Sequence, residues 1–450
     1  AENFLSDKGK RMEEKGFGYI DDLVSGSFLE PVDEFHVMMH DLMHDLAQGV
    51  LSNLLATPKL ETPSKFARHF SYTGDRYDGI TKFQAIKGNK YLRSFLKLGT
   101  SRSYLTNEVP SIVKPSFSCL RVLSLSGYTN LSLPELVECP RQLRYLDVSS
   151  TGIKQLPKWV STLCNLQTLI LSYCSYLERL PADMWRLVSL RHLDIRGASL
   201  VSHMPTRMGE LKNLSTLTDF VVGRDIGSCI KELRELQEIR GKFAIRRLQN
   251  VASPRDAYAV DLRNRKFIDD LELEFDYEVV HQECREVLEN LKPHSDVKRL
   301  TIRGYGGATL PKWLGLGCAE YKEIKFLCLI NCRCCSSLPP LGQLPSLKEL
   351  TIEGMDGIQQ VGHEFYGHDI SSSFPSLESL TFENMKGWEV WSNIGADGGA
   401  ICLPRLKSLR LTDCPNLRGN LPVHVPSLVE LYITRCVLLK WLLPRVPVAR

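Results

Sequence analysis

Large apolar residues recur along most of this chain at a constant spacing. In the segment 143–165, Leu143, Leu146 and Val148 are followed by a polar turn and then by a second apolar group. The next segment, which begins at Leu166, repeats this order. The spacing predicts a short strand with one buried side. A unit of this length cannot bury that side alone, so copies are expected to stack, each covering its neighbour.

The first apolar residue of each unit can be followed along the sequence. An early series begins at Leu120, Leu143, Leu166, Leu190 and Leu214, and a later one at Leu271, Val297, Ile324, Leu347, Leu377, Leu406 and Leu428. Intervals of 22 to 30 residues with this pattern are typical of leucine-rich repeats. The predicted fold is therefore an α/β leucine-rich-repeat solenoid, with a curved parallel sheet on its concave side.

Cysteines support this register. Eight residues after a unit begins stand Cys174, Cys332, Cys414 and Cys436, and Thr151 holds the same place after Leu143. A small polar side chain that points inward there can meet backbone groups at the bend, which explains these cysteines without a disulfide. The alternative, a metal site at Cys332, Cys334 and Cys335, lacks a matching ligand set elsewhere in the sequence.

The first 56 residues do not follow the repeat. Residues 7–29 read as a helix, apolar residues on both sides of the turn 30–33 predict a short β-wing, and a second helix is expected over 39–55. Helix, wing and helix form the C-terminal part of a winged-helix subdomain. Residues 57–115 are interpreted as a linker and degenerate first repeats, with strands near 67–72 and 91–96.

The repeat domain is expected to cover 116–450, with a helical insertion near 219–270. There, residues 230–239 predict a helix with Leu233 and Leu236 inward, and residues 242–248 predict a strand. Ser253 followed by Pro254 marks a further helix start, because serine caps a helix and proline suits its first position.

The string Met39-His40-Asp41-Leu42-Met43-His44-Asp45 allows several interpretations. His40 and His44 are four residues apart and would share a helix face, as in zinc proteases. Asp41, however, stands where such an enzyme has glutamate, and no third ligand follows. The simpler interpretation is an amphipathic helix with both histidines facing solvent.

A third interpretation comes from resemblance. MHDLMHDLAQ, preceded by GFGYIDDLVSGSFLEP, resembles the end of the nucleotide-binding region in plant intracellular immune receptors of the coiled-coil, nucleotide-binding, leucine-rich-repeat type. The stretch LRELQEIRGKFAIRRLQNVASPRDAYAVDLRNRK resembles the helical insertion in the repeats of the same family. The resemblance covers nearly the whole chain.

This resemblance implies a role for Met39, His40 and Asp41. They match the triplet that closes the winged-helix subdomain of the nucleotide-binding (NB-ARC) switch. In that family, the histidine of the triplet approaches the β-phosphate of bound ADP. An imidazole near a helix start suits an anionic phosphate. Because no G-x-x-x-x-G-K-[ST] string occurs, we expect no cofactor in this chain alone, and ADP or ATP only in the full-length protein.

Composition adds limits. The net charge of +4 over 450 residues gives no argument for a nucleic-acid partner. The sequence has no apolar run long enough to span a bilayer and no apolar core of a signal peptide in its first 20 residues. We therefore expect the 14 cysteines to be reduced thiols and the protein to be cytoplasmic.

Residues between the strand leucines are expected to face outward on the concave side. The candidate partner-binding residues are Tyr145, Asp147, His192, Arg196, Arg299, Arg303, Phe326, Ile330, Glu349, Glu353 and Tyr432. Exposed Phe326 and Ile330 beside opposed charges would suit an interface. No catalytic or metal-binding set of residues emerges, so we expect no enzyme.

The resemblance further implies that the repeats recognise a pathogen effector or a guarded host protein. They would also contact the receptor's own nucleotide-binding and coiled-coil domains and hold its ADP/ATP-controlled switch closed. The alternative is a secreted or cell-surface leucine-rich-repeat binding protein. An adaptor for a ubiquitin ligase is a third possibility, but the first segment does not read as an F-box.

Overall fold

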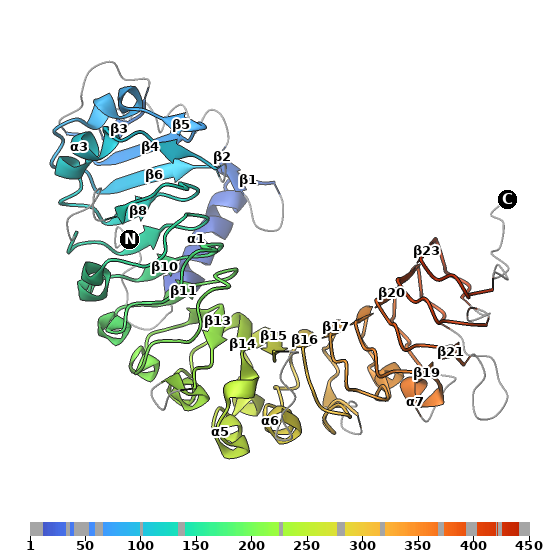
Figure 1. Ribbon diagram of the computed structural model, residues 1–450. Helices are drawn as coiled ribbons and strands as arrows, with labels where there is room; N and C mark the ends of the chain where they lie inside the picture. Colours follow the sequence, from blue (N-terminus) through green and yellow to red (C-terminus); the bar gives the residue numbers. More distant parts are fainter. Residues whose placement is uncertain are drawn as a thin grey trace, which may run out of the picture. The chain divides into compact units, whose positions relative to one another are not determined.

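The computed structural model describes residues 12–32, 37–39, 54–58, 66–99, 102–133, 140–224, 228–276, 284–315, 320–367, 373–392, 403–419, 421 and 425–440. The chain divides into two compact units, residues 1–200 and residues 201–450. Figure 1 shows the elements of each unit.

The N-terminal segment contains the predicted helix and wing. Helix α1 spans Met12–Ser25, and strands β1 (Leu29–Pro31) and β2 (Val37–Met39) pair antiparallel around the turn. The helix ends earlier than predicted because the chain turns at Ser27, whose φ is 58°. The second predicted helix, over 39–55, lies almost entirely outside the described residues, and His40 and Asp41 lie there with it.

Parallel strands form the sheet of the first unit (Figure 1). In spatial order they are β3 (Leu55–Ala56), β4 (His69–Thr73), β6 (Ser94–Leu98), β8 (Val122–Ser124), β9 (Tyr145–Asp147), β10 (Thr168–Ile170) and β11 (His192–Asp194). The connections contain η1 (Ile80–Ile86), α3 (Val109–Val113), η2 (Lys114–Ser116), η3 (Lys158–Thr162) and η4 (Met184–Arg186). A small pair, β5 (Tyr77–Asp78) with β7 (Tyr104–Leu105), lies apart from this sheet.

The second unit has the same plan. Its parallel strands are β13 (Asp219–Val221), β14 (Gly241–Arg246), β15 (Ile268–Glu274), β16 (Arg299–Arg303), β17 (Phe326–Ile330), β18 (Glu349–Glu353), β20 (Ser379–Glu383), β22 (Ser408–Thr412) and β23 (Glu430–Thr434). The connections contain η5 (Met208–Glu210), η7 (Ile230–Glu235), η8 (Leu248–Asn250), α5 (Pro254–Tyr258), η9 (Leu262–Asn264), α6 (Cys284–Asn290), η11 (Leu341–Gln343) and α7 (His363–Tyr366), together with the pair β19 (Gln360–Val361) and β21 (Val390–Trp391).

The predicted register is confirmed in almost every repeat. Strands begin two residues after the first leucine, as Tyr145 follows Leu143, and equivalent residues pair across the sheet. Leu271 is the exception: it pairs with Leu300, so Ile268 takes the place that Val297 has in the next repeat. The predicted start of this repeat, Leu271, was therefore wrong by one apolar position, and the repeat begins at Ile268. Ile268, Leu271 and Leu273 all fit the apolar pattern, and the unequal lengths of the neighbouring repeats allowed either start.

The segment 219–270 was expected to interrupt the repeats, yet the sheet continues through it. Strand β14 pairs with β13 on one side and with β15 on the other. The predicted helix over 230–239 is shorter, a 3-10 helix over 230–235, and Leu233 and Leu236 are buried as predicted. Ser253 caps α5, since its side chain accepts a hydrogen bond of 3.3 Å from the backbone N–H of Arg255.

A residue of left-handed backbone conformation ends most strands. It stands five residues after the strand position that matches Tyr145 and is often glycine, asparagine or aspartate, which tolerate positive φ best. Such residues are Gly99, Gly127, Ser150, Tyr173, Gly197, Gly304, Asn331, Gly354, Asn384, Asp413 and Arg435. The sharp turn aims the next side chain into the core.

That next position holds the cysteines that the sequence marks. Cys174 is buried and lies 3.1 Å from the carbonyl oxygen of Val148, and Thr151 donates to the same oxygen at 2.7 Å. Cys332, Cys414 and Cys436 are likewise buried against backbone carbonyl groups. The inward position of these cysteines is confirmed, and the described cysteines are free thiols.

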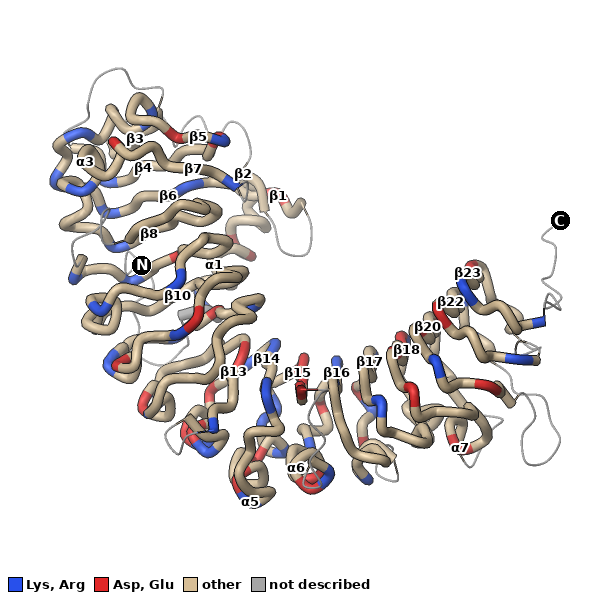
Figure 2. The backbone as a smooth tube through the Cα atoms, in the orientation of Figure 1, with Lys and Arg blue, Asp and Glu red and all other residues tan. Residues whose placement is uncertain are grey.

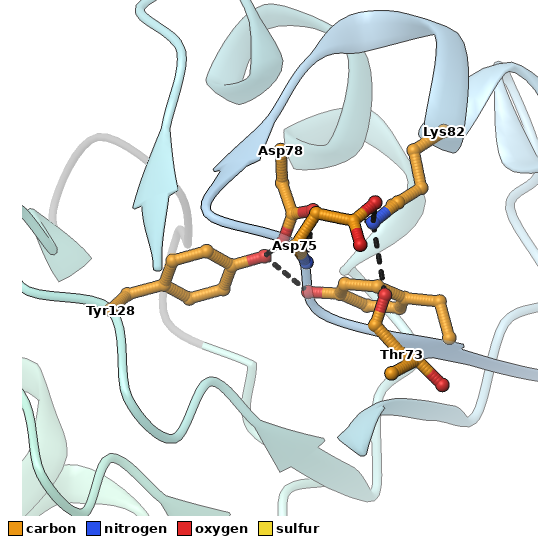
Figure 3. Close-up of polar contacts among 6 residues, drawn as sticks. Thr73, Asp75, Asp78, Lys82 and Tyr128 are labelled. Atoms are coloured by element: carbon orange, nitrogen blue, oxygen red, sulfur yellow. Dashed lines mark hydrogen bonds and ion pairs between the residues drawn. The ribbon is translucent and has the colours of Figure 1, made fainter. Parts of the chain in front are cut away.

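A buried polar cluster joins the early repeats of the first unit (Figure 3). The hydroxyl of Tyr128 donates to the carboxylate of Asp78 and lies 2.8 Å from the hydroxyl of Tyr72. The ammonium of Lys82 reaches Asp78 at 2.5 Å and Asp75 at 2.8 Å. Asp78 and Tyr128 are wholly buried, so no substrate can reach them, and burial raises the pKa of both tyrosines. The cluster is therefore structural.

Candidate protein-interaction faces

In each unit, strand residues alternate between the covered core and the open face of the sheet. On β16, Leu300 and Ile302 are fully buried, whereas Arg299 and Arg303 lie on the open face and are partly exposed. The candidate residues divide between the units. Tyr145, Asp147, His192 and Arg196 belong to the first unit, and Arg299, Arg303, Phe326, Ile330, Glu349, Glu353 and Tyr432 belong to the second.

The open face of the first unit is polar, and several of its polar side chains form hydrogen bonds with one another. Asp147 accepts a hydrogen bond of 3.0 Å from the hydroxyl of Ser124. The guanidinium of Arg196 forms two hydrogen bonds with Asp194, at 2.6 and 3.0 Å. Burial, and secondarily the charge of Asp147, raises the pKa of Tyr145 to about 12. His192 is half-buried on the same face.

Strands β13 to β16 of the second unit form a lattice of opposite charges. Figure 2 shows acidic residues along β15 between basic residues on β14 and β16. The ion pairs include Arg246 with Asp219 at 2.7 Å, Arg303 with Glu272 at 3.3 Å and Arg299 with Asp270 at 3.8 Å. Burial raises the pKa of Asp270 and Glu274, opposed by the neighbouring cations. These ion pairs hold the side chains of Arg246, Arg299 and Arg303 in place.

Phe326 is held at the edge of this lattice. The Arg299 guanidinium lies 3.7 Å from the centre of the Phe326 ring, a cation–π contact, and Phe326 remains half-exposed. Ile330, predicted to be exposed on the same strand, is buried, with 9% of its surface accessible. It lies in the ladder between Arg303 and Glu353, whose longer side chains flank it. On β17, the aromatic side chain that stays accessible on this face is therefore Phe326.

Beyond Phe326 the face becomes acidic. Glu349 is exposed, and Glu353 and Glu383 are half-exposed neighbours in the ladder. Within the described part of the chain, these three carboxylates have no ion pair, in contrast to those on β15. Further along, Tyr432 is 48% exposed and the Arg410 guanidinium lies 4.9 Å from its ring.

Sequence reasoning missed the residues on β13 to β15 that hold the basic side chains. The sequence analysis did not predict Asp219, Glu272 and Asp270 as residues of the open face. It treated 219–270 as an insertion and took Leu271 as the start of a repeat. The signal was present in the sequence, since Ile268, Leu271 and Leu273 repeat the apolar spacing of the other strands.

The described residues form neither a metal site nor a membrane-spanning helix. Among the described residues, no group of three His, Cys, Asp or Glu side chains is placed to hold a metal ion. No described helix combines the length and apolar character that a membrane span requires. Met39 ends β2 and is 43% exposed, while His40 and Asp41 lie outside the described residues, so the proposed nucleotide contact stays a prediction.

Two protein-family models match the chain. The model described as R13L1/DRL21 LRRs matches residues 133–198 and 230–355. The model described as disease resistance protein winged helix domain matches residues 1–47. These matches cover the winged segment and part of the repeats in each unit.

The curated relatives of this chain are also named as disease resistance proteins. The chain is 38% identical to the putative disease resistance protein At3g14460 of Arabidopsis thaliana, over 95% of this chain and 31% of that protein. It is 37% identical to the putative disease resistance RPP13-like protein 1 of Arabidopsis thaliana, over 98% of this chain and 44% of that protein. The chain thus spans less than half the length of these relatives.

Among solved structures, a leucine-rich-repeat protein of Leptospira interrogans aligns with 82% of this chain and 89% of its own, at 20% identity and a TM-score of 0.45. The two Arabidopsis relatives, both named as disease resistance proteins, do not favour the secreted or cell-surface alternative.

Proposed function

Because this chain belongs to the plant disease-resistance proteins that carry a winged-helix domain and leucine-rich repeats, we propose that its repeats recognise a partner protein. The partner is a pathogen effector or a host protein that such an effector modifies. In the whole receptor, which is cytoplasmic in this proposal, the same repeats contact the nucleotide-binding and coiled-coil domains and hold an ADP/ATP switch in its closed state.

The observation that carries this proposal is the arrangement around Phe326. A half-exposed aromatic ring, fixed by the Arg299 guanidinium at 3.7 Å, stands between a charge lattice and the acidic residues Glu349 and Glu353. Interfaces draw most of their binding energy from a few aromatic and arginine residues ringed by polar groups. A rigid, preordered ring of this kind loses little conformational entropy when a partner covers it.

The switch is proposed as a two-state equilibrium. A partner that binds the open receptor more tightly than the closed one shifts the population toward the open state. By resemblance, Met39, His40 and Asp41 lie against the nucleotide in the closed state, and the cofactor is ADP or ATP of the full-length protein. Loss of the His40 side chain would then weaken ADP binding and favour the open state.

The first prediction concerns Phe326→Ala and Arg299→Glu. Each is expected to weaken binding of the recognised protein by about 30-fold, as the loss of a central interface residue costs about 2 kcal/mol or more. The chain serves as bait in extracts of infected and uninfected plant tissue, and the protein retained only from infected tissue is then titrated against each variant.

Arg405→Glu is the matched control, because Arg405 is exposed and lies in the turn before β22, outside the strands that form the open face. It should bind like the unchanged chain. Circular dichroism must show all three variants folded. Unchanged binding in both Phe326→Ala and Arg299→Glu would overturn the assignment of this face.

A further inference from the structure

The connections between strands of the second unit form a hollow that is separate from the open face of the sheet. It has a volume of about 640 Å³ and lies where η7 meets the segment from α5 to η9. Its lining is rich in arginine: Arg234, Arg263 and Arg265 contribute, together with Tyr258, Asp261 and Asn264. A hollow of this size suits a small molecule.

Arg265 forms the floor of the hollow. It is 8% exposed, and its guanidinium donates to the carbonyl oxygens of Leu233, Leu236 and, at 3.1 Å, Val260. These bonds use three of the five N–H groups of a guanidinium. No carboxylate of the described residues lies within ion-pair distance of Arg265. This buried cation is thus hydrogen-bonded to carbonyl groups, and the charge of Asp261 opposes its own only from beyond ion-pair distance.

The other two arginines stand on the walls and are exposed. Arg263 lies 4.8 Å from the ring centre of Tyr258 and 3.5 Å from the carboxylate of Asp261, which also accepts a bond of 2.7 Å from Asn264. Arg234 has no ion pair among the described residues. The lining therefore carries three positive charges against one negative charge, and that one negative charge is already shared by two donors.

We propose that this hollow binds a small compound with several phosphate groups. Guanidinium groups match phosphate oxygens in both charge and geometry, and arginine is preferred wherever such paired bonds form. Because three arginines share this lining, a ligand with more than one phosphate group matches it better than a ligand with a single phosphate. The ring of Tyr258 supplies a flat wall beside them. This proposal is independent of partner recognition on the open face.

Titration calorimetry with inorganic tripolyphosphate tests the proposal on the full chain. We expect one ligand per chain, and a Kd about 100-fold weaker in the double variant Arg234→Gln/Arg263→Gln, since two charge-assisted contacts with the phosphate groups are lost. Both side chains are exposed, so the double variant is expected to fold. Arg405→Gln removes one arginine charge elsewhere on the unit and should leave the Kd unchanged.

A second arm identifies the source of the phosphate groups. Sedimentation with phosphatidylcholine vesicles that contain phosphatidic acid, lost in the same double variant, would assign the site to a lipid headgroup. Titration by tripolyphosphate without vesicle binding would assign it to a soluble compound. The proposal is overturned if neither probe binds, or if Arg405→Gln weakens binding as much as the double variant does.

Discussion

Replacing Asp78 by alanine is expected to destabilise the early repeats of the first unit by about 3–5 kcal/mol, the usual effect of removing one partner from a buried ion pair. Asp78 has no accessible surface, and it accepts from Tyr128 and pairs with Lys82. Without its carboxylate, the buried hydroxyl of Tyr128 loses its acceptor. Hydrogen exchange of peptides from residues 69–98 measures the effect locally, because a repeat protein need not unfold in one step.

Asp75→Ala is the control for this prediction. Asp75 pairs with the same ammonium, that of Lys82, at 2.8 Å, but its side chain is 74% exposed. An exposed ion pair contributes about 0–1 kcal/mol, so exchange in β4 and β6 should change little. Equal effects of Asp75→Ala and Asp78→Ala would show that burial of the cluster does not decide its contribution.

Trp388→Ala is expected to destabilise the repeats around β20 by about 3–5 kcal/mol, the range for removing a large aromatic side chain from a core. Trp388 has no accessible surface, and its ring centre lies 4.6 Å from that of Phe382 and 5.3 Å from that of Trp391. Its indole N–H donates to the carbonyl oxygen of Val390 at 3.0 Å. Hydrogen exchange of peptides from residues 379–392 and 403–419 would rise.

Val390→Ala is the control for Trp388→Ala, because it truncates an exposed side chain close to Trp388 in the sequence. Val390 lies on β21 two residues from Trp388 but is 46% exposed, so its truncation should change the stability by less than about 0.5 kcal/mol. Trp388→Ala also separates folding from recognition. It should raise exchange on the covered side of the sheet, whereas Phe326→Ala should lower partner binding without raising exchange. A Phe326→Ala variant with exchange like that of Trp388→Ala would make Phe326 a structural residue.

Much of the architecture follows from local spacing. Apolar residues two or three apart form a strand with one buried side, so Leu143 and its equivalents set the register of their repeats. The cysteines eight positions later follow from the same count, as the buried Cys174 shows. The wing of the first segment was also readable, because a proline turn separates two short apolar stretches.

The errors have a common cause. The place of Leu271, the continuation of the sheet through 219–270 and the burial of Ile330 all depend on how one repeat lies against the next. Where an insertion changes the interval, the local pattern fits more than one register. The burial of an outward-facing side chain depends on the size of its neighbours in the ladder, which lie 27 or 23 residues away from Ile330.

The sequence by itself therefore determined the repeat, its period, the buried leucines and cysteines, and the family to which the chain belongs. Only the tertiary structure decided which charges meet. Tyr128 and Asp78 are 50 residues apart, and Arg265 reaches carbonyl groups 29 and 32 residues before it. Periodicity specifies which side of a strand is buried, because that depends on residues two apart. It does not specify contacts between connections of unequal length, whose positions are fixed only once the repeats have stacked.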